Sequence, residues 1–232
     1  MKIWLFAAFL ILWGNLLHPL IGGSAVLPGG SWHFVAAGAV LVAFSLVTAL
    51  ALGLDGAALG LRRDGALRGT AIGATLGVVI ALAGVAAMRV VAPAVLGQPV
   101  VYEPLSRVGA GDLTPHVAFF LPLGAVIPEE VAFRGTLLGG LLAKHDLRFA
   151  VTASAATFAL WHGTVAVFTV MNTTLPVVLI IPAIAGALVI LFIGGAVMAG
   201  LRVATGTLLA SVAAHWAFNA IILIGLRYQR ID

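Results

Sequence analysis

Residues 175–200 read LPVVLIIPAIAGALVILFIGGAVMAG, a run of 26 residues without a charged or hydrogen-bonding side chain. A helix that crosses the roughly 30 Å hydrocarbon core of a bilayer needs about 20 mostly apolar residues. The run is long enough to do so, although Pro182 lies inside it. It therefore predicts a transmembrane helix and decides the class of fold to which the chain belongs.

The rest of the composition agrees with this prediction. Hydrophobic residues make up 62% of the 232 residues and charged residues 9%, against about 25% charged in soluble domains. A mean hydropathy of +1.18 leaves too few polar side chains to cover a water-soluble surface. The apolar excess and the absence of cysteine exclude a disordered chain and a disulfide framework. The net charge of +4 is spread over turns that flank the apolar runs, so it predicts no nucleic-acid partner.

Further apolar segments follow the same pattern along the chain. We expect helices over 3–22, 33–54, 69–92, 114–143, 149–171, 175–200 and 207–226. The predicted fold is all-α: a polytopic transmembrane bundle of about seven helices (six to eight), forming a single integral membrane domain over 1–232, with a polar site inside the membrane. The first segment is predicted to be a retained helix, with a signal peptide cleaved near Gly23-Ser24-Ala25 as the alternative. Glycines spaced by four, as at Gly69, Gly73 and Gly77, predict close helix packing.

Basic residues predict the orientation of the bundle. With the N-terminus in the cytoplasm, seven basic residues fall inside: Lys2, Arg62, Arg63, Arg68, Lys144, Arg148 and Arg202. Four fall outside: Arg89, Arg107, Arg227 and Arg230. The positive-inside rule therefore favours a cytoplasmic N-terminus, against which the last two arginines count. In a prokaryote, such a multi-pass protein would lie in the plasma membrane.

Three of the predicted helices contain polar residues that are costly in a membrane. An acidic or basic residue at the centre of a transmembrane helix costs about 2.5–3.5 kcal/mol, so it usually faces a cavity or a partner. Glu130 and Arg134 are four residues apart and share a helix face. Glu129 is rotated about 100° from Glu130. It is therefore free to point elsewhere.

The other two helices carry histidine. Phe158 and His162 are four apart, as are His215 and Asn219, so each pair is stacked on one helix face. A lone intramembrane His or Asn is usually an interhelical hydrogen-bonding residue. Six such groups on three helices instead predict one shared interior site.

Two kinds of chemistry fit these residues. In the first, a partly desolvated Glu129 acts with a histidine to activate water for attack on a carbonyl, while His and Asn N–H groups stabilise the oxyanion. In the second, Glu129, His162 and His215 hold one divalent, zinc-like metal ion with a position open for water. The residues slightly favour the metal-free version, because no helix carries a pair of histidines at a zinc-binding spacing. Both versions hydrolyse an amide bond, and both stay open at this point.

The ordered motifs Glu-Glu-x-x-x-Arg (129–134), Phe-x-x-x-His (158–162) and His-x-x-x-Asn (215–219) resemble the CAAX protease and bacteriocin-processing (CPBP) family, which includes the type II CAAX prenyl endopeptidases. The resemblance covers 114–226, as a CPBP-like catalytic core. It implies an intramembrane endopeptidase, of glutamate or metalloprotease type, acting on a membrane-associated peptide or a lipidated substrate, for which CAAX-type proteins are one candidate.

The resemblance also implies a role for each residue. Glu129 would activate the water with help from His162, and His215 and Asn219 would stabilise the oxyanion or hold the water. Glu130 and Arg134 would be the supporting ion pair, with Phe158 as a further supporting residue.

Two alternative functions stay open. Intramembrane carboxylates with histidine also occur in proton-coupled transporters. A carrier would be expected to show related halves or broken helices around the charges, and the sequence indicates neither. The second alternative is a non-catalytic membrane scaffold of protease ancestry. It would not need to keep Glu129, His162 and Asn219 together.

Overall fold

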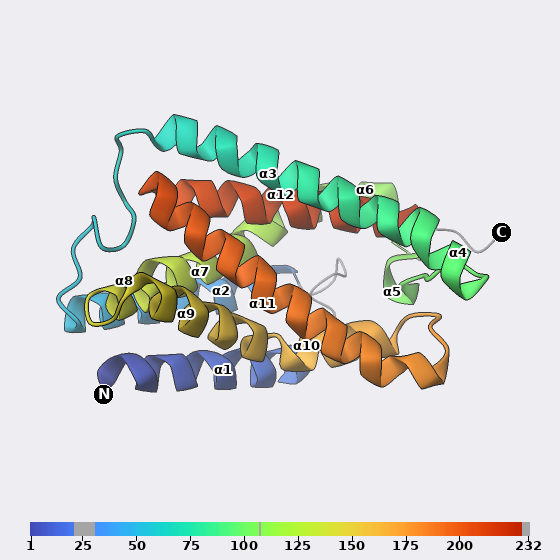
Figure 1. Cartoon of the computed structure of the whole chain (residues 1–232), viewed down its shortest axis with the longest axis horizontal. Coiled ribbons are helices and arrows are strands. Elements are labelled where there is room, and N and C mark those ends of the chain that lie inside the picture. Colours follow the sequence, from blue (N-terminus) through green and yellow to red (C-terminus); the bar gives the residue numbers. More distant parts are fainter. Residues whose placement is uncertain (21–30, 107, 229–232) are drawn as a thin grey trace.

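The computed structural model describes residues 1–20, 31–106 and 108–228, and these form helices joined by loops and turns (Figure 1). Each apolar segment expected from the sequence is helical. The corresponding elements are α1 (Lys2–Leu20), α2 (Ser31–Ala51), α3 (Ala66–Ala86), a composite helix over Ala110–Leu142, the pair α9 (Leu147–Trp161) and α10 (Gly163–Met171), α11 (Ile180–Thr205) and α12 (Leu208–Arg227). The all-helical prediction is therefore confirmed. Gly23-Ser24-Ala25, Arg107 and Arg230, used above for the signal-peptide and orientation arguments, lie outside the described residues.

Membrane crossing is supported for most of these elements. Within the described residues, five helices are long and apolar enough to span a bilayer, and a sixth span results if the bent pair α9–α10 counts as one. The described side chains of α1 form a shorter apolar helix, Lys2–Leu16. The protein is thus an integral multi-pass membrane protein, with five to six candidate spans where the sequence predicted about seven.

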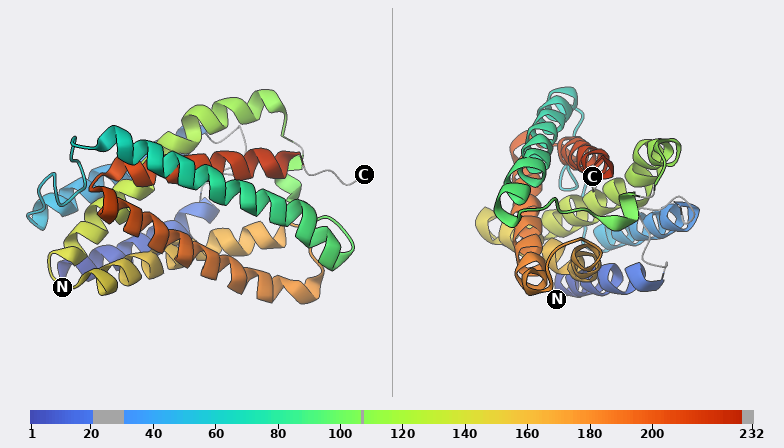
Figure 2. Two further views of the ribbon diagram at one scale, coloured as in Figure 1. Left: turned by 45° about the horizontal axis from the view of Figure 1, so that its top comes forward. Right: turned by 90° about the vertical axis from the view of Figure 1, so that its right-hand side faces the viewer.

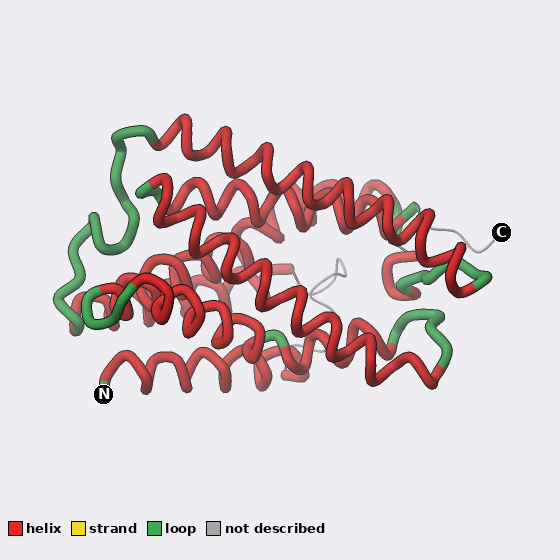
Figure 3. Tube along the Cα trace, viewed as in Figure 1, coloured by secondary structure: helices red, strands yellow, loops and turns green. Residues whose placement is uncertain are grey.

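The helices run roughly along one long axis, and the connections gather at the two ends of the bundle (Figures 1 and 3). The N-terminus lies at one end, together with the α2–α3 connection and the turn between α11 and α12, whereas α12 ends at the opposite end (Figure 1). The two views in Figure 2 show the same arrangement, with α3 lying along α12.

Glycines determine how closely α3 approaches α12. Gly69, Gly73 and Gly77 are buried on one face of α3. A Cβ atom on Gly73 or Gly77 would overlap the carbonyl oxygen of Ala210 or Ala214. The prediction of close packing from the glycine spacing is confirmed, and this contact positions the turn of α12 that carries His215.

The composite helix Ala110–Leu142 is irregular around the acidic residues. It contains π-helical stretches at His116–Phe120, Pro122–Val126 and Val131–Leu137, with the α-helical turn α7 (Ile127–Glu130) between the last two. Pro122 and Pro128 lack the N–H that a helix needs, and π-type turns inside helices are frequent at functional sites. Glu129 and Glu130 thus lie where the helix changes its hydrogen-bonding pattern.

The segment expected as one span over 149–171 is instead broken. Helix α9 ends at Trp161 and α10 begins at Gly163, with a bend of 47° between them. The residue at the break is His162, with φ −88° and ψ 9°. The sequence indicated no broken helix, and this expectation was wrong because the hydrogen bonds that stabilise the break come from α1.

Candidate active site

The most deeply buried part of the site is an ion pair inside the bundle. Arg134 Nη1 lies 3.0 Å from Glu130 Oε1, and neither side chain is exposed. The same carboxylate oxygen accepts a hydrogen bond of 2.8 Å from His215 Nδ1. Since a carboxylate beside arginine can only accept here, Nδ1 of His215 carries the proton. Glu130 therefore joins the composite helix to α12 through Oε1.

Arg134 is also supported by an aromatic ring. Its guanidinium lies 4.2 Å from the ring centroid of Phe158, and its Nη2 donates to the carbonyl of Gly195 at 3.5 Å. Phe158 packs edge-on against Phe133 at 5.1 Å. A desolvated cation over an aromatic face gains about 2 kcal/mol or more, so Phe158 is placed to stabilise the buried charge of Arg134.

Glu129 points away from this ion pair, as the rotation between adjacent helix positions predicted. Its Oε2 lies 3.7 Å from Nε2 of His162, and the two side chains are 12% and 14% exposed. His162 Nδ1 donates to the Phe158 carbonyl at 2.8 Å, and a carbonyl can only accept. The proton of a neutral His162 is therefore on Nδ1, which leaves the lone pair of Nε2 directed toward Glu129.

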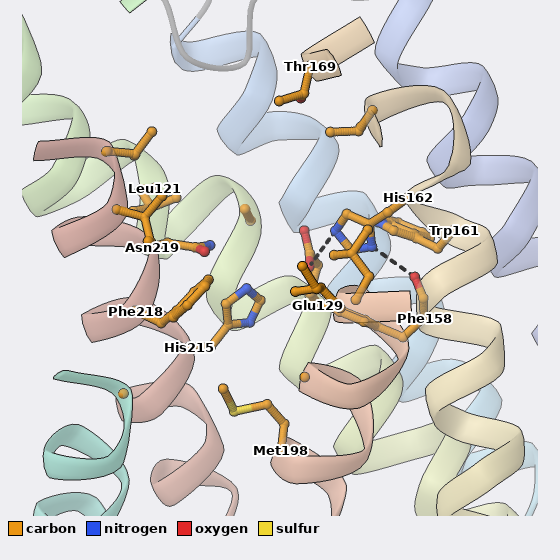
Figure 4. A pocket seen from close by; sticks show the side chains of 18 of the residues that line it. Leu121, Glu129, Phe158, Trp161, His162, Thr169, Met198, His215, Phe218 and Asn219 are labelled. Carbon is orange, nitrogen blue, oxygen red and sulfur yellow. Dashed lines mark hydrogen bonds and ion pairs between the residues drawn. The ribbon is translucent and has the colours of Figure 1, made fainter. Parts of the chain in front are cut away.

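His215 and Asn219 face the same space from α12. Figure 4 shows Glu129 and His162 on one side of the pocket and His215 and Asn219 on the other, with the amide of Asn219 directed inward. The four residues proposed as catalytic from the sequence thus line one cavity. Glu130 and Arg134 are fully buried beside them, and Phe158 lines the same cavity.

The cavity has a volume of about 510 Å³, and most of its wall is apolar. Ligand sites of proteins typically measure about 300–1,000 Å³. Away from Glu129, the lining continues to His116, Thr169 and Tyr102. Burial raises the pKa of the Tyr102 hydroxyl, which therefore stays protonated and can donate a hydrogen bond. The cavity suits an apolar ligand with a few polar groups.

The side chains that line this cavity can carry out acid–base chemistry. A carboxylate and an imidazole nitrogen 3.7 Å apart can both reach one water molecule, and N–H groups from α12 lie across the cavity. Such an arrangement can remove a proton from water and stabilise negative charge on a carbonyl oxygen.

A comparison with protein-family models identifies one match. The model described as "Type II CAAX prenyl endopeptidase Rce1-like" matches residues 112–221. Over these residues, a little under half of the chain, the sequence is similar to the Rce1-like family. The matched segment contains all seven site residues named above, from Glu129 to Asn219. Neither a search of curated proteins nor a search of solved structures gave a match. The family supports an intramembrane endopeptidase of the CAAX type.

The candidate site does not have the geometry of a three-ligand metal centre. Among the residues that the structure describes, no three His, Asp or Glu side chains are grouped so that they could hold a metal ion. The sequence suggested Glu129, His162 and His215 as metal ligands. In the structure, His215 Nδ1 donates a hydrogen bond to Glu130, whereas Glu129 lies beside His162. These residues do not fit a metal ion in this conformation.

The sequence missed several residues that shape the candidate site. Helix α11 supplies part of the cavity wall, including Gly194 and Met198, but the stretch of α11 that lines the cavity is apolar and gives no sign of a site. Trp161, buried beside His162, lines the cavity, whereas Trp216 donates to the Val117 carbonyl at 3.0 Å outside it. Ser211, fully buried, precedes His215 and Asn219 at intervals of four residues, and this spacing could have been recognised.

Proposed function

We propose that the protein is a glutamate-type intramembrane endopeptidase that hydrolyses a peptide bond of a membrane-associated or lipidated substrate. The observation that carries the proposal is the Glu129–His162 pair, 3.7 Å apart on the wall of a largely apolar cavity inside a membrane bundle. The Rce1-like match supports a CAAX-type protein as the substrate.

In the proposed reaction, Glu129 removes a proton from a water molecule held between its carboxylate and Nε2 of His162. The hydroxide attacks the scissile carbonyl carbon, and the carbonyl oxygen becomes an oxyanion. When the C–N bond breaks, the proton held by Glu129 passes to the amine that leaves. All atoms are accounted for: water supplies OH to the acid product and H to the amine.

Two groups on α12 would stabilise the oxyanion. The amide of Asn219 is a donor in any protonation state. His215 offers an Nε2–H only when its ring is protonated, because Nδ1–H is already donated to Glu130. Glu130 accepts the Nδ1–H of His215 and thereby holds this ring at the cavity wall.

The decisive test uses Glu129→Gln in proteoliposomes containing a fluorogenic peptide with a prenylated cysteine near its C-terminus. Glutamine keeps the shape of the side chain but cannot accept the proton, so we expect cleavage to fall by at least about 10²-fold. Glu103→Gln, which changes an exposed carboxylate outside the cavity, is the matched control and should cleave normally. Full activity of Glu129→Gln would overturn the mechanism.

Two further measurements complete the test. A strong chelator should leave the rate of the wild-type protein unchanged, whereas chelator inactivation reversed by zinc would assign the reaction to a metal. A peptide without the prenyl group should be cleaved more slowly, because it lacks the apolar group that the cavity wall accommodates.

The break at His162 favours a second candidate, the proton-coupled transporter. Discontinuous helices at charged midplane sites are typical of secondary transporters, and here one helix breaks beside Glu129. If this function holds, liposomes containing the protein should show proton flux that Glu129→Gln abolishes, without cleavage of any peptide.

A further inference from the structure

The break between α9 and α10 is held by a side chain from another helix, Asn15 of α1. In a continuous α-helix, the N–H of Thr164 would donate to the carbonyl of Leu160. Here Asn15 Nδ2 donates to the Leu160 carbonyl at 2.8 Å, and the Thr164 N–H donates to Asn15 Oδ1 at 2.8 Å. The amide is thus inserted into one hydrogen bond of the helix, which is a recognised cause of a sharp kink.

The amide of Asn15 is used to its full capacity. Its second N–H donates to the Ile11 carbonyl at 2.8 Å, and its oxygen also accepts from the hydroxyl of Thr164 at 2.9 Å. Asparagine has two donors and two acceptor lone pairs, and all four are satisfied. Because an unpaired backbone group inside a membrane costs several kcal/mol, these bonds make the broken helix tolerable.

Two glycines let Asn15 reach the break. A Cβ atom on Gly14 would lie 2.5 Å from atoms of Trp161, so α1 can touch the end of α9 only without a side chain there. A Cβ atom on Gly163 would lie 2.9 Å from Asn15 Oδ1. The contact is therefore enclosed from both sides, and the amide has little freedom to move.

The residue at the break is His162. Its backbone N–H donates to Ala159, three residues back, at 3.1 Å, and its ring Nδ1 donates to the Phe158 carbonyl. The tightened turn and the bend together direct Nε2 toward Glu129. If Thr164 N–H returned to the Leu160 carbonyl, the helix would straighten and the turn that carries His162 would rotate.

We propose that Asn15 is a positioning residue of the active site: it holds the break between α9 and α10 and thereby keeps Nε2 of His162 opposite Glu129. This inference rests on the proposed peptidase function. It also places a requirement of the site on α1, outside the segment 112–221 that matches the Rce1-like family.

The test combines kinetics with a distance measurement on the full chain. The variant Asn15→Leu has a similar volume but no amide, so Leu160 and Thr164 can bond to each other again. We expect kcat to fall by about 10²-fold, the effect of roughly 1 Å of misplacement, while KM changes little. Asn172→Leu, whose Nδ2 bonds only within its own helix end at Phe168, is the matched control and should keep both constants.

The bend itself is measured by electron–electron resonance between spin labels at Leu147→Cys and Met171→Cys. Both positions are exposed, and the chain has no cysteine of its own. In Asn15→Leu the distance between the labels should lengthen as the 47° bend relaxes. Glu129→Gln should leave it unchanged, so this measurement does not depend on peptidase activity.

A wild-type kcat in Asn15→Leu would overturn the inference, and so would a lower kcat with an unchanged label distance. If Asn15→Leu fails to fold, Gly163→Ala pushes the same amide away without removing it and should give both effects; its failure to do so would also overturn the inference. Full activity of Glu129→Gln would instead reject the proposed function and leave the distance result standing.

Discussion

At the scale of single residues, the site separates two adjacent glutamates into different environments. Glu130 is fully buried between Arg134 and His215, whereas Glu129 keeps some exposure in the cavity beside His162. Both are carboxylates on one helix turn, and only the direction of each side chain distinguishes them. The buried one is held in an ion pair, and the other is available to exchange a proton.

Removal of Arg134 should destabilise the protein strongly. Arg134→Met leaves the charge of Glu130 buried without its main partner, which typically costs about 3–5 kcal/mol. We expect a matching loss in the free energy of unfolding, measured by denaturation in mild detergent. The double variant Glu130→Gln/Arg134→Met should recover part of the loss, and Arg148→Met, at an exposed arginine, should behave as wild type. Equal stability of Arg134→Met and wild type would contradict the structure.

Asn219 should affect the chemical step rather than binding. Loss of one donor to an oxyanion lowers kcat by about 10²–10³-fold, so Asn219→Leu should show that loss with a nearly unchanged KM. Steady-state kinetics in proteoliposomes give both constants. A rise in KM alone would mean that Asn219 binds the substrate and does not stabilise the oxyanion.

At the scale of elements, each site residue depends on how its helix is held by a neighbour. Helix α12 brings in His215 because α3 packs against it through glycines, and α9 ends at His162 because α1 supplies the hydrogen bonds for the break. The composite helix places its carboxylates between two π-helical stretches. Close helix packing, a helix break and π-helical turns thus position the residues of one site.

The contact between α3 and α12 gives a prediction at this scale. In Gly73→Ala the new methyl group overlaps the Ala210 carbonyl, so overpacking should cost about 1–3 kcal/mol and lower the peptidase rate by moving His215. The free energy of unfolding and the rate of cleavage are both measured. Gly186→Ala, at a helical glycine with no neighbour within 4 Å of the added atom, should be neutral or slightly stabilising.

At the scale of the whole molecule, the first and last helices of the bundle reach opposite ends of its long axis. Helix α1 begins at one end and α12 finishes at the other (Figure 1). Arg227, which counts against a cytoplasmic N-terminus, therefore lies at the end opposite to Lys2. Its guanidinium Nε donates to the Val108 carbonyl, so this arginine has a structural partner at that end.

The orientation can be tested by labelling single cysteines with a reagent that does not cross membranes. With a cytoplasmic N-terminus, Asp64→Cys should react only after the cells are opened, whereas Gln98→Cys should react in intact cells. Both residues are exposed and lie in connections at opposite ends of the bundle. The reverse pattern would place the N-terminus outside and contradict the count of basic residues.

The sequence by itself determined the class of fold and pointed to the polar residues of the candidate site. Apolar runs of about 20 residues predict membrane helices whatever their partners, and charged groups within them must gather because lipid does not solvate them. The i, i+4 spacing then fixes which side chains share a helix face. The sequence therefore predicted that Glu130 pairs with Arg134 and that Glu129 points in a different direction.

Only the tertiary structure decided how these groups are used. Sequence spacing gives directions around one helix but no distances between helices, so the bond from His215 to Glu130 rather than to Glu129 could not be derived. The break at His162 was equally hidden, because local sequence describes a continuous apolar helix and the amide that interrupts it comes from Asn15, 149 positions before Thr164. The cavity depends on side chains from α11 that carry no polar signal, since only packing makes an apolar residue part of a site.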